Sequence, residues 1–230
     1  MSQTILPTDS FLFKSRSVRN KDIVDFHCTR CSQCCRHSAN SVLVEPIDAF
    51  YITKHLIRQG EALQDTIEFY NQYCVPMPVE GVSFPMFLLN TTGDDDACIF
   101  LKGNCCSIYE VRPRTCRLYP FAVDYGRNGR SFEYLLCTEK PHHLCGGRTS
   151  VNQWMQENLS REYKEFLIHS HTFLQEAGGL LLHMSREKQE SLLSMFLFLY
   201  DTGYDFDQPF LPQHKSRTTR ILDILKRESK

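Results

Sequence analysis

The chain has 230 residues, of which 42 % are hydrophobic and 12 % aromatic, and its formal net charge is −1 at pH 7. This composition excludes extensive disorder and gives no sign of a nucleic-acid partner or of an anionic membrane. No stretch approaches the roughly 18 apolar residues that span a bilayer, and the start of the chain lacks the charged and apolar regions of a signal peptide. We therefore expect a cytoplasmic protein with no membrane partner and no nucleic-acid partner.

The first part of the chain predicts short elements after a cysteine-rich loop. Residues 1–27 carry no periodic pattern, and the loop follows at 28–37. Residues 75–97 mix Pro, Gly and the acidic run Asp94-Asp95-Asp96, which indicates a mainly irregular segment with a solvated turn. The predicted regular elements are a strand at 41–44, a helix at 47–59, a helix at 61–73 and a strand at 84–90.

The middle of the chain predicts two hairpins and a short helix at 110–117. In each hairpin a Gly-Asn or Asn-Gly step separates two runs that contain apolar residues, as tight turns require. The predicted turns and strands are Lys102-Gly103-Asn104 between 97–101 and 107–109, and residues 126–130 between 122–125 and 131–136.

From residue 150 onward cysteine disappears and helical periodicity dominates. The predicted helices cover 151–176, 185–201 and 215–228, with Gly178-Gly179 separating the first two. We predict an α+β fold: small β-hairpins around cysteine metal loops, flanked by helices, with an α-helical C-terminal segment. The expected organisation is a metal-binding domain at 1–149 and a helical segment at 150–230, which packs on it or belongs to the same domain.

Cysteine content is the most informative feature of the sequence. In a reducing compartment, an odd and dense set of cysteines favours metal binding over disulfides. Cys74 lies apart from the other cysteines at the end of a predicted helix, so we expect it to be a buried structural thiol. The eleven cysteines are residues 28, 31, 34, 35, 74, 98, 105, 106, 116, 137 and 145.

The sharpest motif is the run Cys28-Thr29-Arg30-Cys31-Ser32-Gln33-Cys34-Cys35. Thiolates are soft ligands that suit zinc and iron–sulfur clusters, and three cysteines at this spacing match the start of a bacterial ferredoxin run. Adjacent side chains often point in different directions. Either Cys34 and Cys35 therefore bind different metals, or one of the two is a spare thiol.

Two later groups supply further candidate ligands. Cys98, Cys105, Cys106 and Cys116 surround the first predicted hairpin, so Cys98 and Cys106 can approach one centre. Cys137 and Cys145 flank a His-His pair. For each histidine near the cysteines (His27, His37, His142 and His143), a polar loop residue is favoured over a metal ligand.

Arginines between residues 110 and 130 provide positive charge near the second group. A centre with four thiolates carries negative charge, and guanidinium groups can stabilise it by hydrogen bonds to sulfur. Arg112 and Arg117 are the candidates for this supporting role, with a solvated basic face as the equally weighted alternative.

These motifs resemble those of the CxxCxxCC cysteine-cluster family, also called YkgJ-like, a family of zinc- or iron-chelating domains. The first motif is Cys28–Cys35, the second runs from Cys98 through Cys106-Ser107-Ile108-Tyr109-Glu110-Val111-Arg112-Pro113 to Cys116-Arg117, and the last is Cys145-Gly146. The chain departs from the usual pattern at Gln33, where many members have Gly, and at Gly146, where many have Pro. The resemblance covers about residues 26–147 and implies as metal ligands Cys28, Cys31, Cys34, Cys35, Cys98, Cys106, Cys116 and Cys145, with Cys137 accompanying the last.

The function predicted first is metal binding, through an iron–sulfur cluster of the 4Fe–4S type or through zinc. Eight matched thiolates can fill two four-ligand sites or one cluster with thiols left over. A second possibility is an S-adenosylmethionine-dependent flagellin lysine N-methylase, because the resembling family includes one. The chain lacks a Gly-rich loop after a strand and the C-x-x-x-C-x-x-C spacing of radical enzymes. A third is a structural zinc protein whose helical segment binds a protein partner, and whether the chain is an enzyme stays open.

Overall fold

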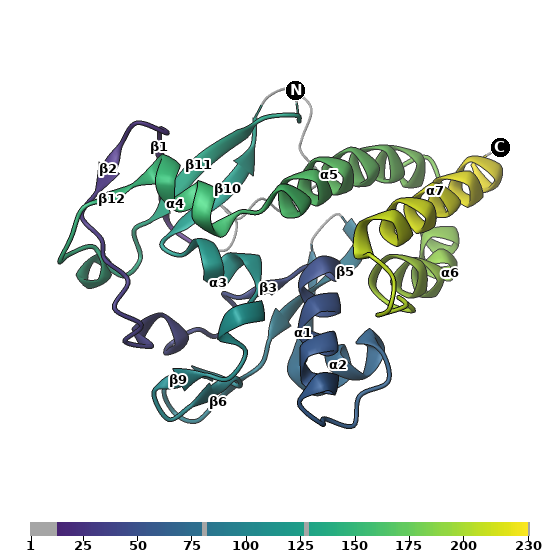
Figure 1. The fold of residues 1–230 in the computed structure, drawn as a ribbon. Coiled ribbons are helices and arrows are strands. Elements are labelled where there is room, and N and C mark those ends of the chain that lie inside the picture. Colours follow the sequence, from purple (N-terminus) through teal and green to yellow (C-terminus); the bar gives the residue numbers. More distant parts are fainter. Residues whose placement is uncertain (1–12, 80–81, 127–128, 230) are drawn as a thin grey trace.

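The structure is a computed structural model that describes residues 13–79, 82–126 and 129–229 (Figure 1). Its helices are α1 Pro46–Arg58, α2 Thr66–Tyr73, α3 Arg114–Leu118, α4 Val151–Asn158, α5 Arg161–Leu181, α6 Arg186–Phe196 and α7 Phe210–Glu228, with the π-helical segment η5 Leu197–Asp201 continuing α6. Single 3-10 turns are η2 Gln33–Cys35, η3 Tyr109–Val111 and η4 Pro141–His143. None of the described helices is both long enough and apolar enough to cross a membrane.

The strands form small antiparallel sheets, which confirms the predicted α+β class. One sheet has the order β1-β11-β10, another has the order β3-β5-β4, and β12-β2, β6-β7 and β8-β9 are two-stranded ribbons. The strands are β1 Ser15–Val18, β2 Ile23–Val24, β3 Leu43–Val44, β4 Cys74–Val79, β5 Val82–Leu89, β6 Thr91–Thr92, β7 Ala97–Cys98, β8 Leu101–Lys102, β9 Cys105–Cys106, β10 Phe121–Tyr125, β11 Phe132–Cys137 and β12 Thr149–Ser150.

The largest hydrophobic core joins the cysteine-rich part of the chain to the helical part. Phe50 of α1 packs with Tyr204 and Phe210, at ring-centroid distances of 6.0 and 5.3 Å. Phe26, just before the first cysteine, packs edge-on against Trp154 of α4 at 5.5 Å. Burial of these large rings removes apolar surface from water across both parts of the chain, so it holds them together.

The C-terminal helices build a second packed layer. In Figure 1, α5 and α7 lie side by side, with α6 beneath them. Phe173 and Ala177 of α5 share a buried cluster with Phe196 of α6 and with Ile221 and Leu225 of α7. The apolar residues of α5 recur at helical spacing, which is why the sequence predicts a helix there.

Several predicted elements are confirmed, and others are wrong for identifiable reasons. The hairpin of β10 and β11 has Val123 opposite Tyr134, within the predicted strands. The segment predicted to be unpatterned holds β1 and β2, whose pairing partners β11 and β12 lie far along the chain. Likewise, β4 forms in a predicted loop because it pairs with β5. Gly178-Gly179 does not separate helices but lies inside α5, where Gly178 is buried.

Candidate metal centre

The first cysteine motif lies on a tightly wound loop between β2 and β3. Arg30, Ser32 and His37 adopt positive φ angles of 57°, 61° and 49°, in the left-handed region that side chains other than Gly rarely occupy. Between the second and third of these, residues Gln33–Cys35 form the 3-10 turn η2. The loop therefore changes direction several times within a few residues.

Hydrogen bonds fix this loop against the hairpin of β8 and β9 and against the acidic turn before β7. The Ser32 hydroxyl donates to the carbonyl of Asn104 at 2.5 Å, at the tip of the hairpin. The backbone N–H of His37 donates to the carbonyl of Asp95 at 2.7 Å, and Arg36 forms an ion pair with the Asp95 carboxylate. The turn predicted to be solvated thus holds the cysteine loop in place.

Tyr109 makes a further connection between the two cysteine motifs. The guanidinium of Arg30 lies 4.7 Å from the centroid of its ring, and that of Arg112 lies 3.9 Å from it. Arg112 also donates to the carbonyl of Tyr109 at 2.7 Å. These cation–π contacts place two positive charges beside the loops that carry the thiols.

Five cysteines from the two motifs come together, and we call them the inner cluster. Burial is the main cause that raises the pKa values of Cys98, Cys106 and Cys116, and the negative charge of other inner-cluster thiols raises each of them further. Cys98 and the partly buried Cys35, Cys106 and Cys116 belong to one hydrophobic core, and Cys34 is hydrogen-bonded to Cys35, so the five thiols lie in one neighbourhood. The members of the inner cluster are Cys34, Cys35, Cys98, Cys106 and Cys116.

Cys34 is the thiol of the inner cluster that ionises most readily. The thiol of Cys35 donates a hydrogen bond to it, which lowers the pKa of Cys34 from 9.0 to about 7, and the positive charges of Lys140 and Arg112 act in the same direction. The same hydrogen bond raises the pKa of Cys35 strongly. A thiolate is the form that binds metals, so this part of the cluster is prepared for a ligand role.

Removal of the Arg112 charge is expected to make Cys34 less reactive. In Arg112→Gln, alkylation of Cys34 near pH 7 should slow by roughly threefold, because the loss of about 1 kcal/mol of charge attraction raises the pKa of Cys34 and lowers its thiolate fraction. Mass spectrometry of the Cys34 peptide during iodoacetamide treatment of the metal-free protein measures this rate. Lys21→Gln, which removes an exposed charge next to β2, is the control and should leave the rate unchanged.

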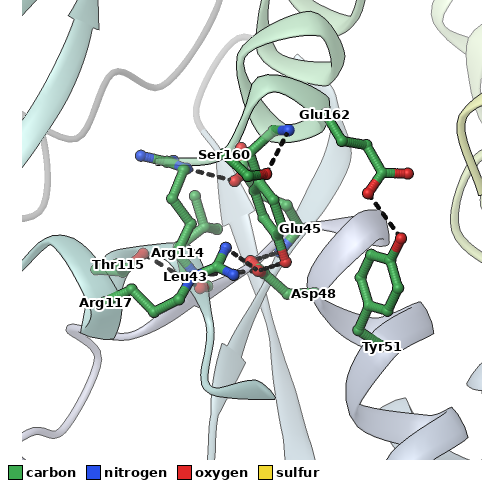
Figure 2. A network of polar contacts seen from close by, with 10 residues as sticks. Leu43, Glu45, Asp48, Tyr51, Arg114, Thr115, Arg117, Ser160 and Glu162 are labelled. Carbon is green, nitrogen blue, oxygen red and sulfur yellow. Dashed lines mark hydrogen bonds and ion pairs between the residues drawn. The ribbon is translucent and has the colours of Figure 1, made fainter. Parts of the chain in front are cut away.

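A buried polar network positions Cys116 (Figure 2). The Asp48 side chain is fully buried in α1 and accepts hydrogen bonds from the backbone N–H of Arg114 at 2.9 Å and from the Tyr163 hydroxyl at 2.8 Å. The Arg114 guanidinium forms an ion pair with Glu45 at 2.6 Å. The short helix that carries Cys116 is therefore attached to the first turn of α1 and to the start of α5.

The structure places the two predicted supporting arginines differently. Arg112 lies beside the thiols, since its charge lowers the pKa values of Cys34 and Cys106. Arg117 pairs with Asp48 at 3.9 Å, and its guanidinium lies 3.8 Å from the centroid of the Tyr163 ring. Arg117 thus belongs to the network around Asp48, a role that the sequence reasoning missed.

The remaining cysteines lie outside the inner cluster. Cys74 is buried, as expected of a structural thiol, and Cys105 is exposed on the hairpin. Of the other four candidate ligands, Cys28 follows β2, Cys145 precedes β12, Cys137 ends β11, and Cys31 lies in the loop between Arg30, which contacts Tyr109, and Ser32, which contacts Asn104. Of these four, only Cys137 is partly buried.

The donor set fits a thiophilic metal centre. Five cysteine sulfurs, of which one ionises near neutral pH, are the soft ligands that zinc and iron–sulfur clusters use, and nearby cations offset their charge. Across the described ranges 13–79, 82–126 and 129–229, no group of three or more His, Cys, Asp or Glu side chains is arranged to hold a single metal ion. The candidate site is thus a gathering of thiols rather than a finished coordination sphere.

Comparisons with known proteins agree with the cysteine chemistry. A relative from Methanocaldococcus jannaschii, itself described as an uncharacterized protein, is 32 % identical over 110 residues, which are 46 % of this chain and 50 % of the relative. The chain therefore spans about half the length of this curated relative. No solved structure matches the present chain. Residues 27–157 match the CxxCxxCC family model, described as "Putative zinc- or iron-chelating domain", and since this is more than half of the sequence, the chain belongs to the CxxCxxCC family.

Proposed function

We propose that the inner cluster binds an iron–sulfur cluster of the 4Fe–4S type, with four of its five cysteines as ligands. The observation that carries the proposal is that thiols from two distant motifs gather at the edge of one hydrophobic core, where Cys35 of the first motif lies with Cys98, Cys106 and Cys116 of the second. Cubane clusters are held by four cysteine thiolates. Such a cluster, when bound, supplies an electron-transfer centre or a Lewis-acidic iron.

The surroundings of the inner cluster support this proposal. A cluster with four thiolates is negatively charged, and Arg112 and Lys140 lie close enough to lower the pKa of Cys34 by their charge. Lys140 is held in place because its ammonium donates to the carbonyls of Arg36 at 2.6 Å and of His37 at 3.2 Å. These fixed cations stabilise the charge of a bound cluster.

Anaerobic purification followed by an absorbance spectrum and elemental analysis of one sample tests the proposal. We expect a broad visible band together with iron and sulfide, and we expect Cys98→Ser and Cys116→Ser each to lose most of both. Cys105→Ser changes an exposed thiol on the same hairpin and is the matched control, with unchanged iron and sulfide. Tightly bound zinc without a visible band would replace the cluster with a structural zinc site, and full iron retention in both variants would overturn the ligand assignment.

A further inference from the structure

His214 of α7 is completely buried at the place where α7 meets α5 and the segment that follows η5. Its Nε2 atom lies 3.2 Å from the hydroxyl of Ser170, a buried residue of α5. Its Nδ1 atom lies 2.9 Å from the hydroxyl of Tyr204, in the segment between η5 and α7. Both ring nitrogens are therefore used, and one imidazole joins α7 to two neighbouring segments.

The hydrogen bonds determine which nitrogen of His214 carries the proton. The Tyr204 hydroxyl donates its one proton to the carbonyl of Tyr200 at 2.5 Å, because a carbonyl oxygen can only accept. The Tyr204 oxygen must then accept from Nδ1–H of His214, which leaves Nε2 to accept from the Ser170 hydroxyl. This arrangement has room for one ring proton, so it requires a neutral His214 with that proton on Nδ1.

The surroundings of His214 disfavour a positive charge. The rings of Phe166 and Phe210 pack against the imidazole at centroid distances of 5.1 and 5.2 Å, so apolar groups take the place of water. Burial is the main cause that lowers the pKa of His214 from 6.5 to about 3, and the positive charges of His169 on α5 and Arg217 on α7 act in the same direction. Geometry and charge thus both keep the ring neutral.

The other titratable groups on the elements around His214 supply no counter-charge. Glu165 of α5 is paired with Lys215 of α7 at 2.5 Å. Burial raises the pKa of Asp201 in η5 to about 8, so that carboxyl is uncharged at neutral pH. Burial also raises the pKa values of the phenols of Tyr200 and Tyr204, which stay uncharged as well. A protonated His214 would therefore be an unpaired cation in the core, which is costly.

We propose that His214 is an acid-sensitive latch, which holds α7 against α5 and η5 while its imidazole is neutral and releases α7 when the imidazole is protonated. Protonation of Nε2 would end the hydrogen bond from Ser170, whereas the hydrated ring of a released α7 accepts a proton with an ordinary pKa. Between about pH 6.5 and pH 3 the open form therefore binds a proton that the closed form does not. The opening equilibrium rises by up to about tenfold for each pH unit of acidification in this range. This inference is independent of metal binding.

Release of α7 would uncover apolar surface on both sides of the helix. Phe210 belongs to the largest core, which also contains Phe50 of α1. Ile221 and Leu225 belong to the cluster that α7 shares with α5 and α6. All of these side chains are almost completely buried in the closed form. The latch thus couples acidification to the exposure of a continuous apolar helix face.

Nuclear magnetic resonance of the chain with ¹⁵N-labelled histidine tests the latch directly. The His214 signals are identified by their loss in His214→Gln. We expect the ring-nitrogen shifts of a neutral imidazole with its proton on Nδ1, and we expect them to stay constant from pH 8 to pH 5. A His214 ring that titrates near pH 6.5 in the folded chain, or that carries its proton on Nε2, would overturn the proposal.

Hydrogen exchange of the α7 amides measures the release itself. Asp201→Asn is the background, because the raised pKa of the Asp201 carboxyl gives the opposite pH dependence if η5 opens together with α7. After correction for intrinsic exchange, the opening equilibrium of α7 should rise at least about tenfold from pH 7 to pH 5. Adding His214→Gln should remove most of this rise, while adding His183→Gln, which changes an exposed histidine after α5, should keep it. An equal rise with His214→Gln, or no rise in the background itself, would overturn the latch.

Discussion

Asp48→Ala is expected to lower the free energy of unfolding by about 3–5 kcal/mol, the cost of removing one partner from a buried ion pair. Burial raises the pKa of Asp48, while the charges of Arg117 and Arg114 and the hydrogen bond from Tyr163 oppose that rise. The variant leaves the backbone N–H of Arg114 and the guanidinium of Arg117 without this carboxylate. Urea denaturation followed by circular dichroism measures the change.

The control for this prediction is an exposed ion pair of the helical layer. Lys215 of α7 pairs with Glu165 of α5 at 2.5 Å, and both side chains are more than 40 % exposed. Glu165→Ala should therefore change the free energy of unfolding only slightly, because solvent screens the pair. A loss in Asp48→Ala no larger than the loss in Glu165→Ala would show that the network around Asp48 does not stabilise the fold.

The same substitution connects fold stability to the candidate centre. Cys116 lies on α3, whose first residue Arg114 donates its backbone N–H to Asp48. If α3 loses this attachment, Cys116 moves relative to the other thiols of the inner cluster. We therefore expect Asp48→Ala to bind less iron than the wild-type chain, even under conditions in which most molecules are folded. The segment Arg112–Arg117 thus both carries Cys116 and fixes its position.

The sequence could predict the cysteine motifs and part of their grouping. The turn at Gly103-Asn104 is formed as expected, and it brings Cys98 and Cys106 into one neighbourhood. The predicted helix at 61–73 begins later, at Thr66, because Asp65 caps it by accepting the N–H of Glu68. Local rules of turns and caps govern these features, so they can be recognised in a short window of sequence.

Contacts between distant segments could not be predicted from the same patterns. The β2–β12 ribbon joins residues more than 120 positions apart, and two-residue strands carry no periodicity. Asp48 is a single carboxylate in an amphipathic helix, where a solvated position is the ordinary expectation, yet tertiary packing buries it completely. The division at residue 149 stays a prediction, while the largest core takes side chains from both sides of it.

Asp201 lies in a second buried polar region, away from the cysteines. It is in η5, and burial raises the pKa of its carboxyl from 3.8 to about 8, although the Tyr70 hydroxyl beside it lowers that pKa in part. Tyr204 lies near the same carboxyl. Burial raises the pKa of Tyr204, and ionisation of Asp201 raises it further. The backbone carbonyl of Asp201 accepts a hydrogen bond from Thr66 at 3.0 Å, so the segment is fixed against α2. The folded protein therefore keeps this carboxyl protonated at neutral pH.

A raised pKa in the folded state makes stability depend on pH in a definite direction. Below about pH 4 the carboxyl is protonated in both states, so its contribution to stability is fully present there. Between about pH 4 and pH 8 only the folded state holds the proton, and stability falls by up to about 1.4 kcal/mol per pH unit until the folded state also ionises.

Asp201→Asn removes this titration while it keeps a neutral side chain of the same shape. We expect the melting temperatures of the variant and the wild-type chain to be similar at pH 4 and to diverge as pH rises, with the variant more stable at pH 8. Asp22→Asn alters an exposed carboxyl whose pKa is lowered by the N–H and charge of Arg19, so it should not reproduce this divergence. Parallel melting temperatures for Asp201→Asn and the wild-type chain across this range would mean that the Asp201 carboxyl is ionised in the folded protein.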